Sequence, residues 1–460
     1  MNSPLQTLYD ALPPVLRSTA ASIHGYRLRW RRYGRETDRL VNETLAREQW
    51  SLEKWHGWQQ ERLARLLHHA ATEVPFYREH WLERRRRGDR SSMENLRNWP
   101  IVHKQQLREN PRAFLARGCK PSKLYENRTS GTTGTPLRLW FSRTTIQEWY
   151  AMMEARLRRW NGVTRHDRWA MLGGKRVVPL ARKSPPFWVW NAGMNQLYCS
   201  ALHIAPWSAR AYLEALERYD IKFLWGYSSS LYLLALEAKR LGLAKPMKVV
   251  ITNAEPLFDY QRRVIGEVFQ CPVRENYGLV EMVSMASECA HGRLHSWPEA
   301  GVPEVIDDNG NPVEAGQAGR LIATGLHNAG MPLIRYDTCD RVQLSTAALP
   351  CGCGRSLPVV DKVWGRSGEV LIAPDGRGIV QIDAIFDDLP NLKEAQIVQE
   401  SLDEFRIRVV PAPDWSEADE RELMAAFKSR VSGVRVTVET TDVIERTSSG
   451  KFRVIVSKLS

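Results

Sequence analysis

The sequence predicts an α/β protein, with a large N-terminal sheet domain that carries a helical N-terminal region and a small, mobile C-terminal α+β domain. Three observations predict this fold class. Apolar residues recur at helical spacing early in the chain, short apolar runs then alternate with helical segments, and two alternating strands flank one helix near the end. The 460 residues are enough for two such domains. We expect the boundaries at residues 1–122, 123–366 and 367–460.

The individual elements are expected in the following order. The segment Glu43–Ala71 carries Leu and Trp at helical spacing, and the run Leu137–Phe141 alternates like a strand. A helix over residues 144–160 follows, with Thr144 as its N-cap. Later helices are expected at 209–219, 228–241 and 416–431, and later strands at 223–225, 248–252, 396–398, 405–410 and 434–438.

Composition limits the class of protein. Apolar residues make up 43% and charged residues 25% of the chain, values typical of globular proteins. No run of about 18 apolar residues occurs, so no transmembrane helix is expected. The first 25 residues contain Asp10 and Pro13-Pro14 and no continuous apolar stretch, which argues against a signal peptide. With seven cysteines, we expect a cytoplasmic, reducing location.

The formal charge of +13 raises the question of an anionic partner. No zinc-finger, helix-turn-helix or RNA-recognition signature occurs, so nucleic acid is not expected. In residues 5–33, Leu and Ile alternate with Arg and aromatic residues. That composition leaves open a peripheral contact with the inner face of a membrane.

The densest chemical signal is the stretch Thr129–Pro136, which is rich in Gly, Ser and Thr. Glycines let a backbone approach a polyphosphate closely, and hydroxyl and N–H groups donate to its oxygens. The stretch lacks the Gly-Lys-Ser/Thr ending of a Walker A loop. On composition alone, a phosphate-binding loop and a flexible turn both remain open.

The order of several segments brings in a family resemblance. The stretch Thr129–Pro136 resembles the phosphate loop of the adenylate-forming superfamily, which includes acyl-CoA synthetases. Five further segments resemble that superfamily's motifs in the same order. They are Asn253–Pro256, Asn276–Glu281, Arg335–Asp340, Gly365-Arg366 and Arg446–Lys451.

Within the superfamily, the chain is most similar to the phenylacetate–CoA ligase branch. The CapK-type relatives of capsule and exopolysaccharide gene clusters look closest. This resemblance extends over nearly the whole chain from about residue 40. It rests on segments such as His68-His-Ala70, Val74–Tyr77, Trp99–Lys104, Trp225-Gly-Tyr227 and Cys351–Arg355.

The resemblance implies a role for each matching residue. Lys451, Glu281 and Thr129 would be catalytic, with Lys451 at the reacting carboxylate and Glu281 holding Mg²⁺. Tyr277 would stack on adenine, and Asp340 would accept hydrogen bonds from the ribose hydroxyls. The implied nucleotide-binding set is completed by Ser130, Gly131, Thr132, Thr133, Gly134, Thr135, Ala254, Glu255, Pro256, Asn276, Gly278 and Arg366.

Two positions depart from the superfamily pattern. Cys339 stands where the motif has Gly, which could alter the turn that presents Asp340. After Gly365-Arg366 the usual Asp or Lys is missing, so Glu369 is the candidate hinge residue.

The cysteines form a second candidate site. Cys351 and Cys353 are a close pair, and Cys289 and His295 lie upstream, with His291 as the less favoured histidine. Three thiolates and one imidazole can close a tetrahedral zinc site that has a structural role. Some phenylacetate–CoA ligase relatives resemble this pattern. Reduced cysteines on a surface loop remain the alternative.

Together these residues predict ATP-dependent activation of a carboxylic acid to acyl-AMP with release of pyrophosphate. Transfer to CoA, or to a sugar or carrier acceptor, would follow, with a role in polysaccharide biosynthesis. The alternative is a catalytically idle nucleotide-binding scaffold in a polysaccharide assembly complex. The expected cofactors are ATP, Mg²⁺, CoA and structural Zn²⁺. Candidate pocket residues for the acid are Trp225, Gly226, Tyr227 and His203. The sequence does not identify the acid, the acceptor or the oligomeric state.

Overall fold

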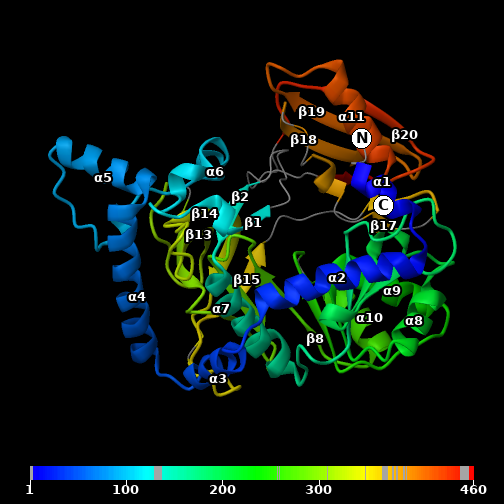
Figure 1. The fold of residues 1–460 in the computed structure, drawn as a ribbon, viewed down its shortest axis with the longest axis horizontal. Helices are drawn as coiled ribbons and strands as arrows, with labels where there is room; N and C mark the ends of the chain where they lie inside the picture. The colour runs from blue at the N-terminus through cyan, green and yellow to red at the C-terminus, as the bar shows by residue number, and fades with distance from the viewer. Residues whose placement is uncertain are drawn as a thin grey trace.

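The computed structural model describes most of the chain as a mixed α/β architecture, which confirms the predicted fold class (Figure 1). The described residues are 4–128, 137–255, 257, 259–307, 309–347, 349–364, 371–375, 378–379, 382–386, 389, 391–445 and 455–459. No helix within them is long and apolar enough to cross a bilayer.

The chain begins with helices. α1 (Pro4–Ala11) and α2 (Pro14–Arg32) lead to α3 (Thr37–Arg47), and α4 (Leu52–Glu73) continues into α5 (Pro75–Arg86). In Figure 1, α2 crosses the front of the molecule, and α4 and α5 extend from the opposite side. The helix expected from Glu43 to Ala71 is therefore two helices. Ser51 accepts a 3.2 Å hydrogen bond from Lys54 N and caps the second of them.

A short hairpin and a long helix connect this region to the sheets. The hairpin joins β1 (Tyr125–Arg128) to β2 (Arg138–Phe141). α7 (Arg143–Met153) follows and continues as one π-helical turn, η4 (Glu154–Arg158), and a 3-10 turn, η5 (Arg159–Asn161). The expected cap Thr144 is wrong by two positions. Ser142 caps α7, because its side chain accepts a 3.0 Å hydrogen bond from Thr145 N.

The first large sheet has six strands in the order β4-β5-β3-β6-β7-β8. All neighbours are parallel except the edge strand β4. The chain passes from β3 to β5 on one side and then to β6 on the other, so the strand order reverses at β3. Ligands of such sheets bind outside the carboxyl ends of the strands at that point. The strands are β3 (Trp169–Gly173), β4 (Trp188–Asn191), β5 (Gln196–Ser200), β6 (Phe223–Tyr227), β7 (Val249–Asn253) and β8 (Val273–Arg274).

Three helices accompany this sheet: α8 (Ala209–Arg218), α9 (Ser228–Arg240) and α10 (Asp259–Phe269). The predicted helices 209–219 and 228–241 and the predicted strands 223–225 and 248–252 are confirmed within two residues. The apolar faces of α8 and α9 and the strands that they cover form one buried core cluster. The alternation of apolar positions along these helices accounts for that burial.

The second large sheet is antiparallel and was not predicted. Its order is β12-β13-β14-β15-β11-β10-β9. Its strands are β9 (Asn276–Gly278), β10 (Met285–Glu288), β11 (Leu294–Ser296), β12 (Gly301–Ile306), β13 (Ala318–Gly325), β14 (Tyr336–Leu344) and β15 (Val359–Trp364).

The C-terminal part forms a four-stranded sheet in the order β20-β19-β18-β21. α11 (Glu417–Lys428) begins with a capping box between Ser416 and Asp419, and it packs Leu423 and Phe427 into a separate apolar core. The strands and helix expected here are confirmed, although the strands run longer than predicted. The strands are β18 (Leu392–Gln399), β19 (Glu404–Pro411), β20 (Arg435–Thr440) and β21 (Ile455–Ser457), and the hairpin β16 (Leu371–Ile372) and β17 (Gly378–Ile379) precedes them.

Candidate nucleotide site and Cys/His cluster

Two hydrogen bonds tie the third and fourth sequence motifs together. Tyr277 Oη, on β9, donates to Asp340 Oδ2 of β14 at 2.8 Å. Tyr336 Oη, at the start of β14, donates to Glu281 Oε1 at 2.6 Å. The structure therefore brings together three residues that the sequence predicted, Tyr277, Glu281 and Asp340. Tyr336 joins them, although no role was assigned to it.

The start of β14 is held in place by a segment far upstream. Val102 forms a parallel bridge with Tyr336, through hydrogen bonds from Val102 N to Arg335 O and from Asp337 N to Val102 O, both 2.9 Å. Lys104 Nζ donates to Thr338 O at 2.9 Å. The family-like segment Trp99–Lys104 thus supports the strand that carries Asp340. In the sequence, only the family resemblance indicated that this segment has a role.

Burial controls the electrostatics of Glu281. Its side chain is buried, and no salt bridge to Lys or Arg forms within the described residues. Desolvation raises the pKa of the Glu281 carboxyl, and the hydrogen bond from Tyr336 opposes that rise. A buried carboxylate without a basic partner gains from a bound cation, so this environment fits the predicted Mg²⁺ ligand.

The turn that presents Asp340 tolerates the Cys339 departure. Cys339 has φ 63°, in the left-handed region that favours glycine. Its backbone N donates to Asp337 Oδ1 at 2.9 Å, and Asp340 N donates to Thr338 Oγ1 at 3.1 Å. These side-chain caps stabilise the turn, so the backbone keeps a shape that glycine would also adopt.

The residues predicted to shape the purine pocket lie at adjacent strand ends. Asn253 ends β7, and Ala254 follows it with φ 65°. Ser228 Oγ donates to Glu255 O at 3.2 Å. The side-chain oxygens of Asn253 and Asn276 are buried and have no hydrogen-bond partner among the described residues. Unpaired buried acceptors are costly, and an adenine amino group would supply the missing donor. This set of residues fits a nucleotide base.

The candidate acid-pocket residues have different surroundings. Trp225 and Gly226 are buried in β6, with the Trp225 ring 5.8 Å from that of Trp169, and Tyr227 is half-buried. His203 is fully buried. Its Nδ1 lies 2.8 Å from Ser200 Oγ and its Nε2 lies 3.2 Å from Pro179 O. Both nitrogens have partners within the protein, and the role in substrate binding stays a prediction.

Several predicted residues lie outside the described part of the chain. They are Thr129, Ser130, Gly131, Thr132, Thr133, Gly134, Thr135, Pro256, Arg366, Glu369 and Lys451.

The four predicted zinc ligands converge. One ligand atom each from Cys289, His295, Cys351 and Cys353 lies within 4.8 Å of the others. His295 Nδ1 is 3.0 Å from Leu357 O, which can only accept, so Nδ1 carries the proton. His295 Nε2 then directs its lone pair toward Cys353 Sγ, 3.5 Å away. His295 rather than the exposed His291 takes part, which agrees with the preference from the sequence.

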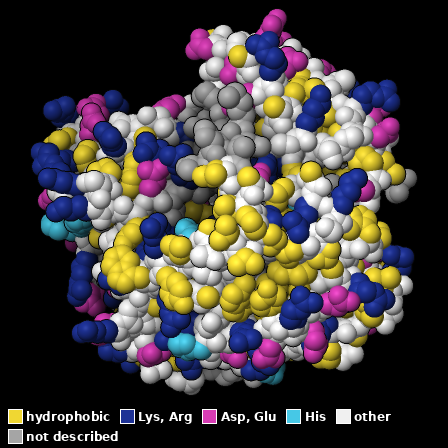
Figure 2. Space-filling model, turned by 45° about the vertical axis from the view of Figure 1, so that its right-hand side comes forward, with side chains coloured by type: hydrophobic (Ala, Val, Ile, Leu, Met, Phe, Trp, Pro, Cys, Tyr) yellow, Lys and Arg dark blue, Asp and Glu magenta, His cyan; other side chains and the backbone are white. Residues whose placement is uncertain are grey.

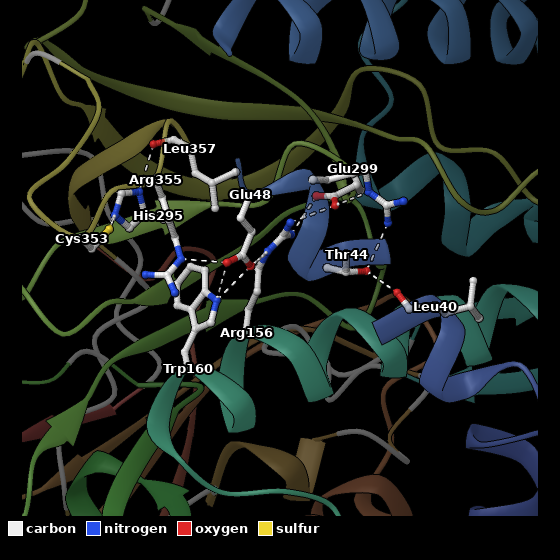
Figure 3. Close-up of polar contacts among 11 residues, drawn as sticks. Leu40, Thr44, Glu48, Arg156, Trp160, His295, Glu299, Cys353, Arg355 and Leu357 are labelled. Atoms are coloured by element: carbon white, nitrogen blue, oxygen red, sulfur yellow. Dashed lines mark hydrogen bonds and ion pairs between the residues drawn. The ribbon is translucent and has the colours of Figure 1, made fainter. Parts of the chain in front are cut away.

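A buried ion-pair network lies beside this Cys/His cluster (Figure 3). Glu48, just beyond α3, accepts from Arg156 Nε at 3.2 Å, from Arg355 Nε at 2.8 Å and from Trp160 Nε1 at 2.9 Å. Arg156 also forms a bidentate pair with Glu299, at 2.7 and 2.8 Å. Sequence reasoning missed this network. It joins the N-terminal helices to the loop that carries Cys353.

Comparisons with known proteins agree with this geometry. Residues 371–458 match the family model of the CapK C-terminal domain. Protein CapK of Staphylococcus aureus is 24% identical over 412 residues, covering 87% of this chain and 89% of that protein. Phenylacetate-coenzyme A ligase of Pseudomonas putida is 27% identical over 346 residues, covering 73% and 76%. Over most of its length the chain is therefore similar to CapK and to phenylacetate–CoA ligases.

A solved structure shares the fold of this chain. The structure of 2-hydroxyisobutyryl-CoA ligase in complex with 2-HIB-AMP and CoA, in the thioesterification state, superposes with a TM-score of 0.57 at 20% identity. The superposition covers 90% of this chain and 92% of that one. The likeness therefore extends over both the sheet region and the C-terminal part.

Proposed function

We propose that this protein activates a carboxylic acid with ATP and transfers the acyl group to CoA. The observation that carries the proposal is the cluster of Tyr277, Glu281 and Asp340, joined through two tyrosine–carboxylate hydrogen bonds. The relatives named as phenylacetate–CoA ligases support this reaction class. The acyl-AMP and CoA bound to the related solved ligase support the order of the two steps.

In the first step, a carboxylate oxygen attacks the α-phosphorus of ATP, and the bond to pyrophosphate breaks. Tyr277 would stack on adenine, and Asp340 would accept from the ribose hydroxyls. Glu281 would hold Mg²⁺, which neutralises phosphate charge when bound. Lys451 would lie at the reacting carboxylate. In the second step, the acceptor thiolate attacks the acyl carbon, and AMP leaves. Rotation of the small domain about residues 366–369 would separate the two steps.

ATP–pyrophosphate exchange across a panel of aryl, fatty, amino and sugar acids tests the proposal. Exchange that depends on one class of acid is expected, and Lys451→Ala should abolish it. Full exchange in that variant would refute the role of Lys451. ATP binding without exchange for any acid would favour the idle scaffold instead. A place in polysaccharide biosynthesis is supported by the similarity to CapK, and a sugar acid or sugar amine as co-substrate would be its biochemical sign.

The Cys/His cluster supports a structural zinc site. Its four donors converge, and the His295 tautomer leaves one nitrogen available. We expect one zinc per chain by elemental analysis of protein purified without added metal. Cys353→Ser should remove the zinc and lower the melting temperature. Cys119→Ser, which lies outside the cluster, should keep the zinc and the melting temperature of the wild type. If the purified wild type contained no zinc and melted at the same temperature as Cys353→Ser, the zinc site would be refuted.

We also propose that the enzyme is cytoplasmic and that the outer face of α2 contacts the inner face of the membrane. Val15, Ile23, Tyr26 and Trp30 of α2 are each more than half exposed. Figure 2 shows apolar side chains gathered across the face that α2 crosses. Residues 4–35 contain six Arg and one acidic residue, Asp10, which pairs with Arg176. Apolar side chains flanked by arginine suit an anionic lipid surface.

Vesicle sedimentation tests this contact. The protein should bind vesicles containing phosphatidylglycerol and not those of phosphatidylcholine alone. Ile23→Ser with Trp30→Ser should weaken binding at least fivefold. Leu402→Ser with Val443→Ser removes exposed apolar side chains elsewhere and should leave binding unchanged. Equal binding by both double variants would refute the α2 contact.

A further inference from the structure

Two arginines in the last turn of α2 have buried donors without acceptors. The Arg31 guanidinium carbon lies 5.2 Å from the ring centroid of Tyr125 on β1, and that of Arg32 lies 4.3 Å from the ring centroid of Tyr150 on α7. Nε of both arginines is buried and has no hydrogen-bond partner in the part of the chain that the structure describes. A buried charged donor without an acceptor costs free energy, so the arrangement favours an added anion.

A third cation comes from a different segment. Lys175 follows β3, and its backbone N donates to Tyr198 Oη at 3.3 Å. Desolvation, then the nearby charges of Arg32 and Arg31, lower the pKa of Lys175. Its side chain nevertheless reaches solvent.

Within the described residues, no carboxylate is among the charged groups that shift the pKa of Lys175 or of Arg31. The charges that shift the pKa of Lys175 are arginines, and those that shift the pKa of Arg31 are Arg32, Tyr150 and Tyr125. His24 lies about two helical turns before Arg31 on α2. Its pKa is lowered by desolvation and by these same cations. Like charges held together repel one another, and the free energy of that repulsion is recovered when an anion binds.

The helix dipole explains the position of the two arginines but not that of Lys175. The C-terminus of α2 carries partial negative charge, which favours Arg31 and Arg32 there. It does not explain why Lys175, from the loop after β3, is brought to the same place. It also does not supply acceptors for the two buried Nε atoms.

The position of the three cations fits a reactant of the enzyme. β1 ends at Arg128, one residue before the predicted phosphate loop. β3 is the strand at which the order of the parallel sheet reverses, and Lys175 lies two residues beyond its carboxyl end. Figure 1 shows the C-terminal end of α2 beside α7 and below the β1 hairpin. The cations therefore border the region where nucleotides bind in such folds.

We infer that Arg31, Arg32 and Lys175 form a binding site for phosphate groups, and that the ligand is the phosphorylated end of the acyl acceptor. The aromatic rings of Tyr125 and Tyr150 hold the two guanidinium groups in position. Arginine forks match phosphate oxygens, and the lysine adds a point charge. The phosphate chemistry follows from the cations themselves, whereas the assignment to the acceptor rests on the proposed function.

Calorimetric titration of the full chain tests the inference. The ligands are CoA, 3′-dephospho-CoA, ATP and inorganic pyrophosphate, each at two salt concentrations. The variant Arg31→Gln/Arg32→Gln/Lys175→Gln removes the site. The matched control is Arg27→Gln/Arg29→Gln, which removes two positive charges from the exposed side of the same helix end. We expect the triple variant to raise the Kd for CoA at least tenfold and to flatten its salt dependence. The control should bind CoA as the wild type does.

The other outcomes each decide something. A larger loss for ATP or pyrophosphate than for CoA would assign the cations to the nucleotide and overturn the acceptor assignment. Equal affinities of the triple variant and the wild type for all four ligands would overturn the site. In a further case, the wild type binds pyrophosphate but shows no ATP–pyrophosphate exchange with any acid. If the triple variant then lost pyrophosphate binding, the phosphate site would stand and the proposed reaction would be refuted. Loss of discrimination between CoA and 3′-dephospho-CoA would place the 3′-phosphate at these residues.

Discussion

The hydroxyl of Tyr277 donates to Asp340 across 2.8 Å and so couples the predicted adenine-stacking residue to the predicted ribose-binding residue. Tyr277→Phe keeps the ring and removes this bond. A hydrogen bond to a charged group contributes about 1.5–3 kcal/mol. We therefore expect the KM for ATP to rise roughly tenfold to a hundredfold, with a smaller change in kcat. Steady-state kinetics at saturating acid measures this change.

The control for Tyr277 is a buried tyrosine outside the site. Tyr212 Oη donates to Ser200 O at 2.6 Å in the core beneath α8. Tyr212→Phe should lower the free energy of unfolding by about as much as Tyr277→Phe does, and it should leave the KM for ATP unchanged. A raised KM in both variants would mean that lost stability, not lost ribose positioning, explains the effect.

The buried carboxyl of Glu281 should make stability depend on pH. Its pKa is raised in the folded protein by desolvation, so folding favours the protonated form. This contribution is fully present below the unfolded pKa of about 4.3 and is lost as pH rises through the folded pKa. Without nucleotide, Glu281→Gln should therefore melt higher than the wild type at pH 8 and at the same temperature at about pH 3.5, below the unfolded pKa. Melting curves across that range test the sign.

Mg²⁺ with ATP should reverse this difference, because a bound cation stabilises the ionised carboxylate of the wild type. The Gln variant should gain little from the addition. If it gained as much as the wild type, Glu281 would not be the Mg²⁺ ligand.

Much of the parallel sheet could be predicted, because its strands are short apolar runs that alternate with amphipathic helices. The antiparallel sheet could not. Strands such as β9 and β11 have only three residues, too few to show alternation, and β11 pairs with the distant β15. Ser142 was missed as a cap because both it and Thr144 are good N-cap residues and periodicity does not fix a helix end.

The site was predicted in outline only through the family resemblance. Composition alone does not pair Tyr277 with Asp340, which lie 63 residues apart. Tyr336 lies inside the Arg335–Asp340 motif, yet nothing in the sequence shows that its hydroxyl faces Glu281. The Glu48–Arg156–Glu299 network joins residues 108 and 143 positions apart. Only the fold brings such charges together, so no local pattern indicates them.

The Cys339 turn separates backbone shape from side-chain chemistry. An L-residue in the left-handed region costs roughly 1–2 kcal/mol, whereas glycine loses roughly 0.5–1 kcal/mol through its freedom in the unfolded chain. Cys339→Gly should therefore change the free energy of unfolding by less than about 1 kcal/mol and retain ATP binding. Cys339→Val should lose roughly 1–3 kcal/mol, because a β-branched residue fits this region poorly. Urea denaturation and ATP titration of both variants decide the matter. A catalytic need for the thiol would instead make the Gly variant inactive while folded.

Replacing Arg156 should lower the free energy of unfolding strongly, because its side chain is fully buried between Glu48 and Glu299. Burial alone would lower its pKa, but attraction to the two carboxylates raises it. Arg156→Met leaves buried carboxylates without their main cation, and breaking such a pair costs about 3–5 kcal/mol. The exposed Arg39, paired with Glu36 and Glu43, is the matched control, since exposed pairs contribute little. Arg39→Met should denature at the same urea concentration as the wild type. Arg156→Met should denature at a clearly lower concentration and, because Glu48 also holds Arg355, should bind zinc less tightly. Unchanged zinc affinity in a destabilised Arg156→Met protein would show that the network supports the helices alone.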